Sequence, residues 1–171
     1  MNLPTNIAVA ATDITALYQV AGGRVMAVGR YAVHEACAAY LRADDDWSIW
    51  VHPDNKSYRD VWVAASRGAV WSKGTKRDDD RGNVDMQLKT WGKNVDVDHL
   101  LPRSWAPLAN GQLRLIRIWP VWGEVNRSWG AGAEKAQKAK YEQGLAPFPK
   151  PIGGIWYAKA AQIYKILGMR A

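Results

Sequence analysis

Apolar residues recur along the chain at two different spacings, and the spacing predicts which segments are helices and which are strands. Apolar positions at helical intervals predict helices over residues 8–20, 32–41, 84–91, 122–143 and 156–167. Short runs rich in Val, Ile and Trp predict strands over residues 24–29, 47–52, 58–64, 95–98 and 113–119. Because the two kinds of element are mixed along the chain, the pattern predicts an α+β fold.

Turn residues divide these segments. The sequence PDNKS at residues 53–57 predicts a β-hairpin that joins the strands on either side of it. Pro120 is expected to end the strand before it, and Gly144 to end the long helix. The alternation over residues 113–119 is imperfect, which indicates burial on both faces of that strand. Loops are expected over residues 44–46, 73–83 and 100–112, with a proline-containing connector after Gly144.

Composition narrows the class of protein. The chain has 171 residues, of which 48% are hydrophobic and 23% charged, so it is expected to form a globular core rather than a disordered chain. No apolar run approaches the ~20 residues that span a bilayer, and no secretion signal is present, so no membrane partner is expected. The single cysteine, Cys37, excludes an internal disulfide and is expected to be buried. His34 and His52 are expected to be structural or surface residues.

Positive charge is concentrated in the C-terminal part of the chain. The net charge is +7, and counting Lys, Arg, Asp and Glu gives −1 for residues 1–98 and +8 for residues 99–171. A surface of this kind suits a polyanion, because neutralised phosphates release counterions. A protein that is merely basic and well solvated remains the alternative. The ten tryptophans are expected mainly in the core, with a few available to stack on bases.

The polar residues with the most chemistry lie between residues 94 and 143. Asp96, Asp98 and His99 end one predicted strand, Asn110 follows in the loop, and Asn126 with Arg127 lies near the start of the long helix. Carboxylate and amide oxygens are hard ligands that suit Mg²⁺ or Mn²⁺. An imidazole beside them can take a proton from an attacking water near neutral pH. The set therefore suggests a hydrolytic metal site.

At these residues the sequence resembles the HNH branch of the His-Me finger (ββα-metal) nucleases. The segment DVDHLLPRSWA resembles the first strand and loop of that family, and EVNRSWGAGAEKA resembles its helix start. The resemblance covers about residues 94–143. It implies a ββα-metal nuclease core there, with an N-terminal helix and β-hairpin part (residues 1–93) packed on it. Residues 144–171 would form the connector and a C-terminal helix.

The resemblance also implies roles for individual residues. His99 would be the general base that activates water, and Asp98 and Asn126 would coordinate Mg²⁺ or Mn²⁺. Asn110 would help to orient the histidine, and Arg127 would contact a phosphate. The chain lacks the cysteine pairs that hold a structural zinc in many relatives, so the core would depend on packing. The tryptophans expected to provide that packing are Trp105, Trp119, Trp122 and Trp129.

Some alternatives remain open at this point. Successive residues of a regular strand face opposite ways, so Asp98 and His99 enter one cleft only if the strand ends or bulges there. Asp96 shares a face with Asp98 and is a rival metal ligand or a partner of the ligands. Asn126 is also a good helix cap, so it can have a purely structural role.

The sequence thus predicts a metal-dependent endonuclease that hydrolyses phosphodiester bonds, with DNA as the preferred substrate. Such a protein would be an antibacterial toxin domain, with an acidic immunity protein as a partner, or a nuclease of a phage or mobile element. It would be cytoplasmic, or delivered into a target cell. The alternatives are a non-catalytic, Trp-rich nucleic-acid-binding module and a protein-binding adaptor. The residues expected to contact nucleic acid are Arg103, Arg114, Lys135, Lys138 and Lys140.

Overall fold

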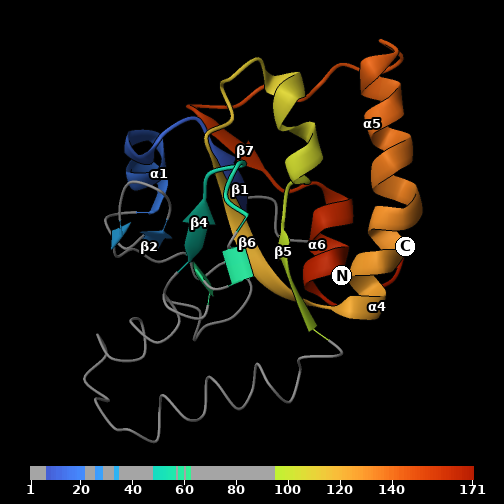
Figure 1. Cartoon of the computed structure of the whole chain (residues 1–171). Coiled ribbons are helices and arrows are strands. Elements are labelled where there is room, and N and C mark those ends of the chain that lie inside the picture. The colour runs from blue at the N-terminus through green and yellow to red at the C-terminus, as the bar shows by residue number, and fades with distance from the viewer. Residues whose placement is uncertain are drawn as a thin grey trace, which may run out of the picture.

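The computed structural model of the chain describes residues 7–21, 26–28, 33–34, 48–56, 58–59, 61–62 and 95–171. Its strands are β1 (Ala8–Ala11), β2 (Met26–Val28), β3 (Val33–His34), β4 (Ile49–Val51), β5 (Val95–His99), β6 (Leu115–Trp122) and β7 (Ile155–Tyr157). Its helices are α1 (Ile14–Ala21), the 3-10 helix η1 (Arg103–Ala109), α4 (Gly123–Ser128), the π turn η2 (Trp129–Ala133), α5 (Glu134–Glu142) and α6 (Ala160–Ile166). The described residues therefore form a mixed α+β structure, as predicted (Figure 1).

Strand β6 organises the sheet that these strands form, in the order β3-β2-β4-β6-β1-β7 with β5 also paired to β6. Ile116 of β6 pairs with both β4 and β1, and Ile118 pairs with both β4 and β5. Because a strand has two edges, β1 and β5 must share the edge opposite β4. All of these pairs are antiparallel except β2 with β4. The sheet therefore combines strands from residues 1–93, 94–143 and 144–171, the three parts into which the sequence divides the chain.

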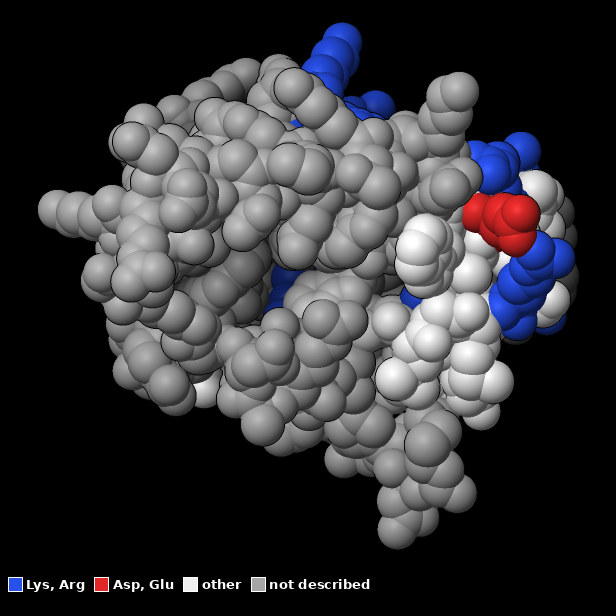
Figure 2. All heavy atoms as spheres, turned by 90° about the horizontal axis from the view of Figure 1, so that it is seen from below, with Lys and Arg blue, Asp and Glu red and all other residues white. Residues whose placement is uncertain are grey.

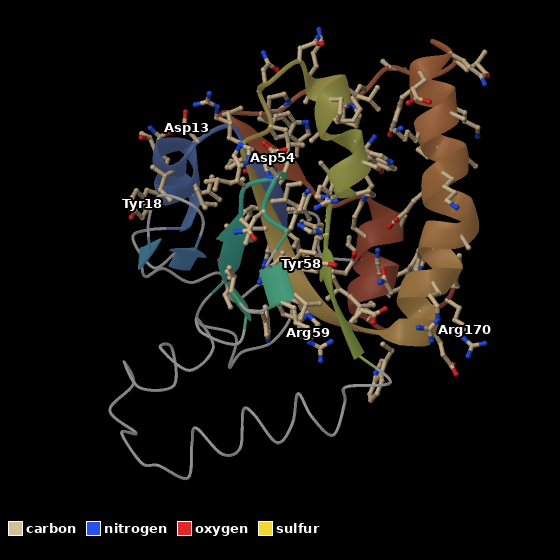
Figure 3. All side chains as sticks on the ribbon, in the orientation of Figure 1. Asp13, Tyr18, Asp54, Tyr58, Arg59 and Arg170 are labelled. Atoms are coloured by element: carbon tan, nitrogen blue, oxygen red, sulfur yellow. The ribbon has the colours of Figure 1, made fainter. Side chains whose placement is uncertain are left out.

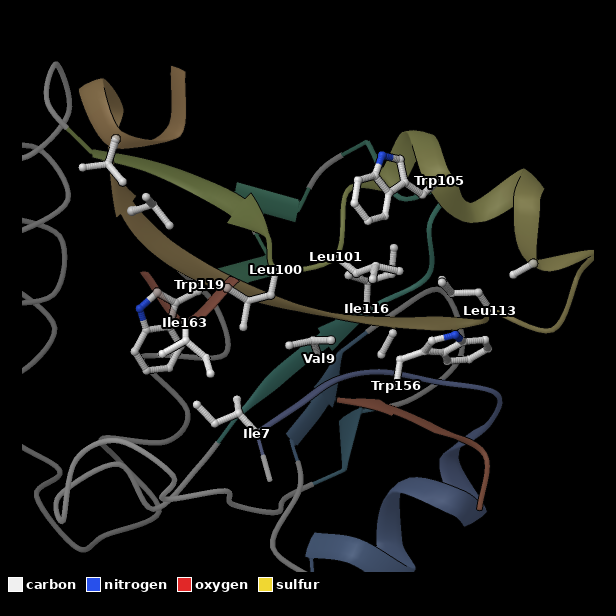
Figure 4. Close-up of a cluster of buried hydrophobic side chains, with 14 residues drawn as sticks. Ile7, Val9, Leu100, Leu101, Trp105, Leu113, Ile116, Trp119, Trp156 and Ile163 are labelled. Atoms are coloured by element: carbon white, nitrogen blue, oxygen red, sulfur yellow. The ribbon is translucent and has the colours of Figure 1, made fainter. Parts of the chain in front are cut away.

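Apolar side chains cover both faces of the sheet. Ala8 of β1 belongs to a cluster that includes Leu17 of α1, whereas Val9 belongs to a second cluster on the opposite face. The second cluster, drawn in Figure 4, includes Trp105 of η1 and Ile163 of α6. Figure 1 shows α1 on one side of the sheet and η1, α5 and α6 on the other. Residues 116–119 of β6 are all buried between these layers, which confirms the expected burial on both faces.

The predicted helix over residues 8–20 is wrong in its first half. Residues 8–11 form β1, all four of whose side chains are buried, and only Ile14–Ala21 is helical. A short apolar run buried on both faces cannot be told from a helix by its periodicity. Asp13 fixes the start of α1, because its side-chain oxygen accepts a hydrogen bond from the Ala16 N–H at 2.7 Å.

The hairpin predicted after residue 52 is also wrong. Strand β4 and the turn at Pro53 and Asp54 are present, but Tyr58, Arg59, Val61 and Trp62 are helical rather than extended. Helical spacing places residues four apart on one side, and both aromatic rings of this segment contact the β5–β6 pair. The centroid of the Tyr58 ring lies 4.6 Å from that of the His99 ring, and the centroid of the Trp62 ring lies 6.4 Å from that of the Trp119 ring. Tertiary packing therefore overrides the β-propensity of the segment.

In residues 32–41 the structure describes only Val33–His34, which pair with β2 as strand β3 and not as part of a helix. The predicted strand over residues 24–29 is confirmed at Met26–Val28. The predictions for Cys37, for the loops at residues 44–46 and 73–83 and for the helix at residues 84–91 lie outside the described residues. Among the helices that the structure describes, none is both long and apolar enough to cross a membrane.

The C-terminal part follows the sequence pattern more closely. β5 is confirmed, and residues 123–142 form one helical segment in which the π turn separates α4 from α5. β6 runs through Pro120 to Trp122, so the expected stop at Pro120 is wrong. Because β4 pairs only with residues 116–118, it requires no hydrogen-bond donor at Pro120. The last helix is shorter than expected, because Ile155–Tyr157 pair with β1 as strand β7.

Gly154 joins the C-terminal connector to β1, and its replacement by alanine should destabilise the fold. Its φ is +79°, and a Cβ there would lie 2.6 Å from Thr12 Oγ1 and 2.8 Å from the Ala16 Cβ. Its carbonyl also accepts the Thr12 N–H at 2.8 Å, so the chain cannot move away freely. We expect Gly154→Ala to lower the free energy of unfolding by about 2–4 kcal/mol in urea denaturation.

Gly153→Ala is the matched control for this substitution. Gly153 also has a positive φ, of +57°, but nothing lies within 4 Å of the Cβ position. Gly153→Ala should therefore lower the free energy of unfolding only by the cost of the backbone conformation, about 1–2 kcal/mol. Equal losses in the two variants would show that the contacts with α1 do not matter.

Candidate active site

Strand β5 places its polar residues on two different faces. It pairs with β6 one residue to one from Val95 through His99, without a bulge. Because side chains alternate along a regular strand, Asp96 and Asp98 share one face and His99 lies on the other. The bulge that would have brought Asp98 and His99 into one cleft is therefore absent from β5.

Helix α4 brings Asn126 to the face of β5 that carries the aspartates. The helix begins directly after β6 and packs against both strands of the pair. The Asn126 Nδ2 donates a hydrogen bond to Asp96 Oδ2 at 3.1 Å. Asn126 therefore contacts Asp96, the residue that the sequence leaves as a rival ligand, and not Asp98. It lies inside α4, so it does not cap the helix.

A lysine from the last helix holds the Asp98 side chain. Lys165 of α6 is 3% exposed, and its Nζ forms ion pairs with Asp98 Oδ2 and with Glu134 Oε1 of α5, the latter at 2.8 Å. We call Asp98, Glu134 and Lys165 the ionic triad. Burial by itself would lower the pKa of Lys165, but the two carboxylates outweigh it and raise that pKa. The ammonium is therefore charged, and the triad fastens β5, α5 and α6 together.

Burial acts in the opposite direction on the carboxyl group. It raises the pKa of Asp98 even though Lys165 beside it lowers that pKa, and Glu134 raises it further. Two carboxylates share one ammonium here, so the triad carries an excess of negative charge within a largely buried region. A group with additional positive charge would be stabilised at this place.

His99 lies at the end of β5 in an apolar environment. It is 6% exposed, and its ring packs edge-to-face on the Tyr58 ring. Its Nε2 is buried and has no hydrogen-bond partner in the part of the chain that the structure describes. Burial lowers the pKa of His99 to about 4, with further lowering by the positive charges of Arg103 and Lys165. The imidazole is therefore neutral at pH 7 and has a nitrogen able to accept a proton.

This buried histidine predicts a loss of stability in mild acid. The folded pKa of about 4 lies below the ordinary 6.5, so the unfolded chain binds the proton first as the pH falls. The contribution of the neutral His99 to stability is fully present above pH ~6.5. As the pH falls from ~6.5 to ~4, the free energy of unfolding should decline by at most about 3 kcal/mol. Urea denaturation of the wild type and of His99→Gln over this range measures the effect. The difference between the two proteins should change with pH, and a constant difference would contradict the prediction.

The other predicted residues are dispersed around this region. Asn110 is exposed, has a φ of +51°, and caps η1 by donating its N–H to Pro107 O. Its described hydrogen bond thus stays within η1 and does not reach His99. Arg127 is exposed, and its guanidinium lies over Gly123 at the start of α4. Glu124, in the same turn, is ion-paired to Arg170, which Figure 3 places beside α4.

The basic residues proposed to bind nucleic acid lie on the surface. Arg103, Arg114, Lys135 and Lys140 are exposed, and Lys138 forms an ion pair at 2.9 Å with Glu142 one turn later. At the right edge of the lower face of the molecule, Lys and Arg side chains flank acidic ones (Figure 2). Of the tryptophans expected to pack the core, Trp105 and Trp119 are buried and Trp129 is partly buried. Trp122 is 53% exposed, so its expected packing is wrong.

The main residue that the sequence reasoning missed is Lys165. It lies among apolar positions of the last helix, between Ile163 and Ile166. A lysine within an apolar stripe requires a carboxylate partner if the stripe is buried, and that signal is present in the sequence. Tyr58 was missed because its segment reads as a strand.

The oxygen donors on this side of β5 fit a hard divalent cation in kind. They are carboxylates and one amide, from Asp96, Asp98, Asn126 and Glu134, which are the ligand types that Mg²⁺ and Mn²⁺ prefer. Within the described ranges, however, no three His, Cys, Asp or Glu side chains are clustered closely enough to hold a metal by themselves. A cation bound by Asp98 and Glu134 would have to compete with the Lys165 ammonium.

Comparison with protein-family models, with curated proteins and with solved structures finds no match for the chain. What the protein does must therefore be inferred from its own geometry.

Proposed function

We propose that the chain is a metal-dependent endonuclease that hydrolyses phosphodiester bonds, with DNA as its preferred substrate. The observation that carries the proposal is the return of α4 onto β5. The antiparallel β5–β6 pair is followed at once by a helix, and Asn126 of that helix is hydrogen-bonded to Asp96, two residues before the Asp98–His99 pair. This order of strand, strand and helix supports a ββα-metal core of the HNH type at residues 94–143.

In this proposal each residue has one task. The neutral His99 imidazole is the candidate to accept a proton at Nε2 from the attacking water. Because His99 lies on the face of β5 opposite Asp98, this role requires the end of β5 to rearrange when cation and substrate bind. Asp98 and Asn126 would hold the cation, and Asp96, which is hydrogen-bonded to Asn126, would hold that amide in place. A bound Mg²⁺ or Mn²⁺ supplies charge stabilisation to a phosphate oxygen and to the leaving group. Arg127 contacts a phosphate in this scheme.

Basic residues provide the expected attraction for the substrate. Residues 99–171 carry a net charge of +8, and Arg103, Arg114, Lys135 and Lys140 are exposed to solvent. Contacts of this kind are made to phosphates and are independent of base sequence. If the protein is a toxin domain, an acidic immunity protein would cover the same residues.

Cleavage of supercoiled plasmid DNA tests the proposal. We expect nicking in the presence of Mg²⁺ or Mn²⁺ and none after chelation by EDTA. Asp98→Asn and Asn126→Ala should each raise the cation concentration needed for half-maximal cleavage by about 10-fold or more, because the first removes the negative charge of a ligand and the second removes an oxygen ligand. Titration of each variant with Mn²⁺ measures the shift.

Glu142→Gln is the matched control for the loss of a carboxylate. Glu142 lies on α5 but pairs only with Lys138 among the described contacts, so its variant should require no more cation than the wild type. If Asp98→Asn and Asn126→Ala also respond as the wild type does, the cation site is misplaced. Cleavage that persists in EDTA would contradict a metal-dependent mechanism.

The ionic triad favours a second candidate, a non-catalytic nucleic-acid-binding module. Lys165 already satisfies Asp98 and Glu134, and His99 is buried, so the same residues can serve stability alone. Such a module would bind DNA with a strong dependence on salt but would not cut it under any cation. The plasmid assay and a salt titration of binding, performed on one preparation, distinguish the two candidates.

A further inference from the structure

A cavity of about 290 Å³ lies next to the ionic triad, between η1, α5, α6 and the segment leading into β7. Its volume lies just below the ~300–1,000 Å³ typical of small-molecule sites. Aromatic rings make up much of its wall, contributed by Trp105, Trp129, Tyr141, Trp156 and Tyr157. Contacts between rings hold the wall in place. Tyr141 packs edge-to-face on Trp105 and on Phe148, with ring centroids 5.3 Å apart in each pair.

One of these rings has an unused hydrogen-bond donor. The indole N–H groups of Trp129 and Trp156 donate to the backbone carbonyls of Met169 and Pro149, each at 2.8 Å. The Trp105 Nε1 is buried, and it has no partner among the residues that the structure describes. Trp105 as a whole is only 5% exposed, so water does not easily satisfy it. An unpaired buried N–H is costly, and a ligand acceptor that reached the Trp105 N–H from the cavity would remove that cost.

The polar groups of the cavity are suited to a neutral ligand. Its acidic lining residue Glu134 and its buried cation Lys165 are paired with each other, and its other cationic residue, Lys159, is exposed to solvent. Gln137 adds an amide that can both donate and accept. A ligand with an acceptor for Trp105 and a donor for Glu134 or Gln137 would use two of these polar groups. Aromatic walls add stacking energy for a flat ring.

We infer that this cavity binds a planar, neutral heteroaromatic ring with both donor and acceptor atoms on its edge, namely a nucleobase. The choice of a nucleobase over other heterocycles rests on the proposed function, since the C-terminal part is basic. The base can come from a nucleic-acid strand or from a free nucleotide. Lys165 lines the cavity and also contacts Asp98, so a strand held here by its base would pass close to the proposed cleavage site.

Isothermal titration in EDTA tests the inference without any cleavage. The probes are the four deoxynucleoside 5′-monophosphates, 2-deoxyribose 5-phosphate, and a single-stranded octanucleotide with and without one central abasic position. We expect at least one nucleotide to bind about 10-fold or more tightly than the sugar phosphate, because the ring supplies the contacts. Trp105→Phe keeps an aromatic ring, although a smaller one, and loses the indole N–H; it should weaken nucleotide binding by about 3- to 10-fold.

Trp122→Phe is the matched control, since Trp122 is a largely exposed indole that does not line the cavity. It should leave nucleotide affinity unchanged. In spectra of the ¹⁵N-labelled protein, the indole resonance that disappears in Trp105→Phe should move on addition of the nucleotide. This shift reports the nucleotide at the Trp105 indole even if the variant is less stable than the wild type.

The octanucleotide distinguishes the two sources of the base. Tighter binding of the intact strand than of the abasic strand, lost in Trp105→Phe, supports a strand base as the occupant. The same losses with mononucleotides alone support a free nucleotide. Equal binding of nucleotide and sugar phosphate, or an indole resonance that does not move, would overturn the inference. EDTA prevents metal-dependent cleavage, so this experiment measures binding alone. A protein that binds the base here but never cuts DNA would contradict the proposed nuclease activity and not this inference.

Discussion

Replacement of His99 by alanine should lower the rate of DNA cleavage by about 10²–10⁴-fold, the usual cost of losing a positioned general base. DNA affinity and the cation requirement should stay near those of the wild type, because in the proposed mechanism His99 binds neither ligand. Single-turnover cleavage of plasmid measures the rate, and a salt titration of binding measures the affinity. The neutral, unpaired Nε2 of this residue is the structural reason for the expectation.

His52→Ala is the matched control for this variant. His52 is half-buried in the turn after β4, where its Nδ1 accepts the Asp54 N–H at 3.1 Å, so its loss should affect cleavage little. His99→Gln, which fills more of the space than alanine, provides a second test if His99→Ala folds poorly. Near-wild-type turnover in folded His99 variants would remove this residue from the mechanism.

Replacement of Lys165 by methionine should cost about 3–5 kcal/mol of unfolding free energy, the largest effect on stability that we expect. The change leaves Asp98 and Glu134 facing each other in a largely buried region without the ammonium that both contact. Urea denaturation at pH 7 measures the loss. Lys140→Met, at an exposed position of α5, should change stability by no more than ~0.5 kcal/mol.

A double variant separates the loss of charge pairing from the loss of packing. Asp98→Asn together with Lys165→Met removes one carboxylate and the ammonium, and should recover part of the stability lost in Lys165→Met alone. Recovery is expected because fewer unpaired charges then remain buried. If the double variant is as unstable as the sum of the single ones, the triad does not act as a unit. In the nuclease proposal, Lys165→Met should also bind Mn²⁺ more tightly, since the competing cation is gone.

The sequence predicts the C-terminal half of the fold better than the N-terminal half, and the reason is physical. β5, β6 and the helical segment after residue 122 carry local signals that agree with their packing. The apolar runs at residues 8–11 and 58–62 carry no local signal that separates strand from helix. Burial on both faces and tertiary contacts decide their conformation. Whether they form strand or helix depends on partners far away in the sequence.

The candidate site is predictable as a set of residues but not as a set of contacts. Asp98, His99 and Asn126 do belong to adjacent elements, yet Asn126 bonds Asp96, and Asp98 bonds Lys165. The second contact joins positions 67 residues apart, and no spacing rule along the chain reports it. Ion pairs of this kind arise only when three elements have packed, so they are the part of a site that a sequence pattern conveys least.

The π turn between α4 and α5 sets the rotational phase of everything after it. A regular α-helix advances about 100° per residue, so Asn126 and Glu134, eight residues apart, would differ by about 80° around the axis. The wider turn at Trp129–Ala133 absorbs the equivalent of one residue and reduces that difference to about 20° in the opposite sense. Both side chains are thereby directed to the same side of the helical segment, toward β5 and α6. The inserted residue thus acts as a phase shift, and it allows one continuous helical segment to serve two polar contacts that a uniform helix would present at different angles.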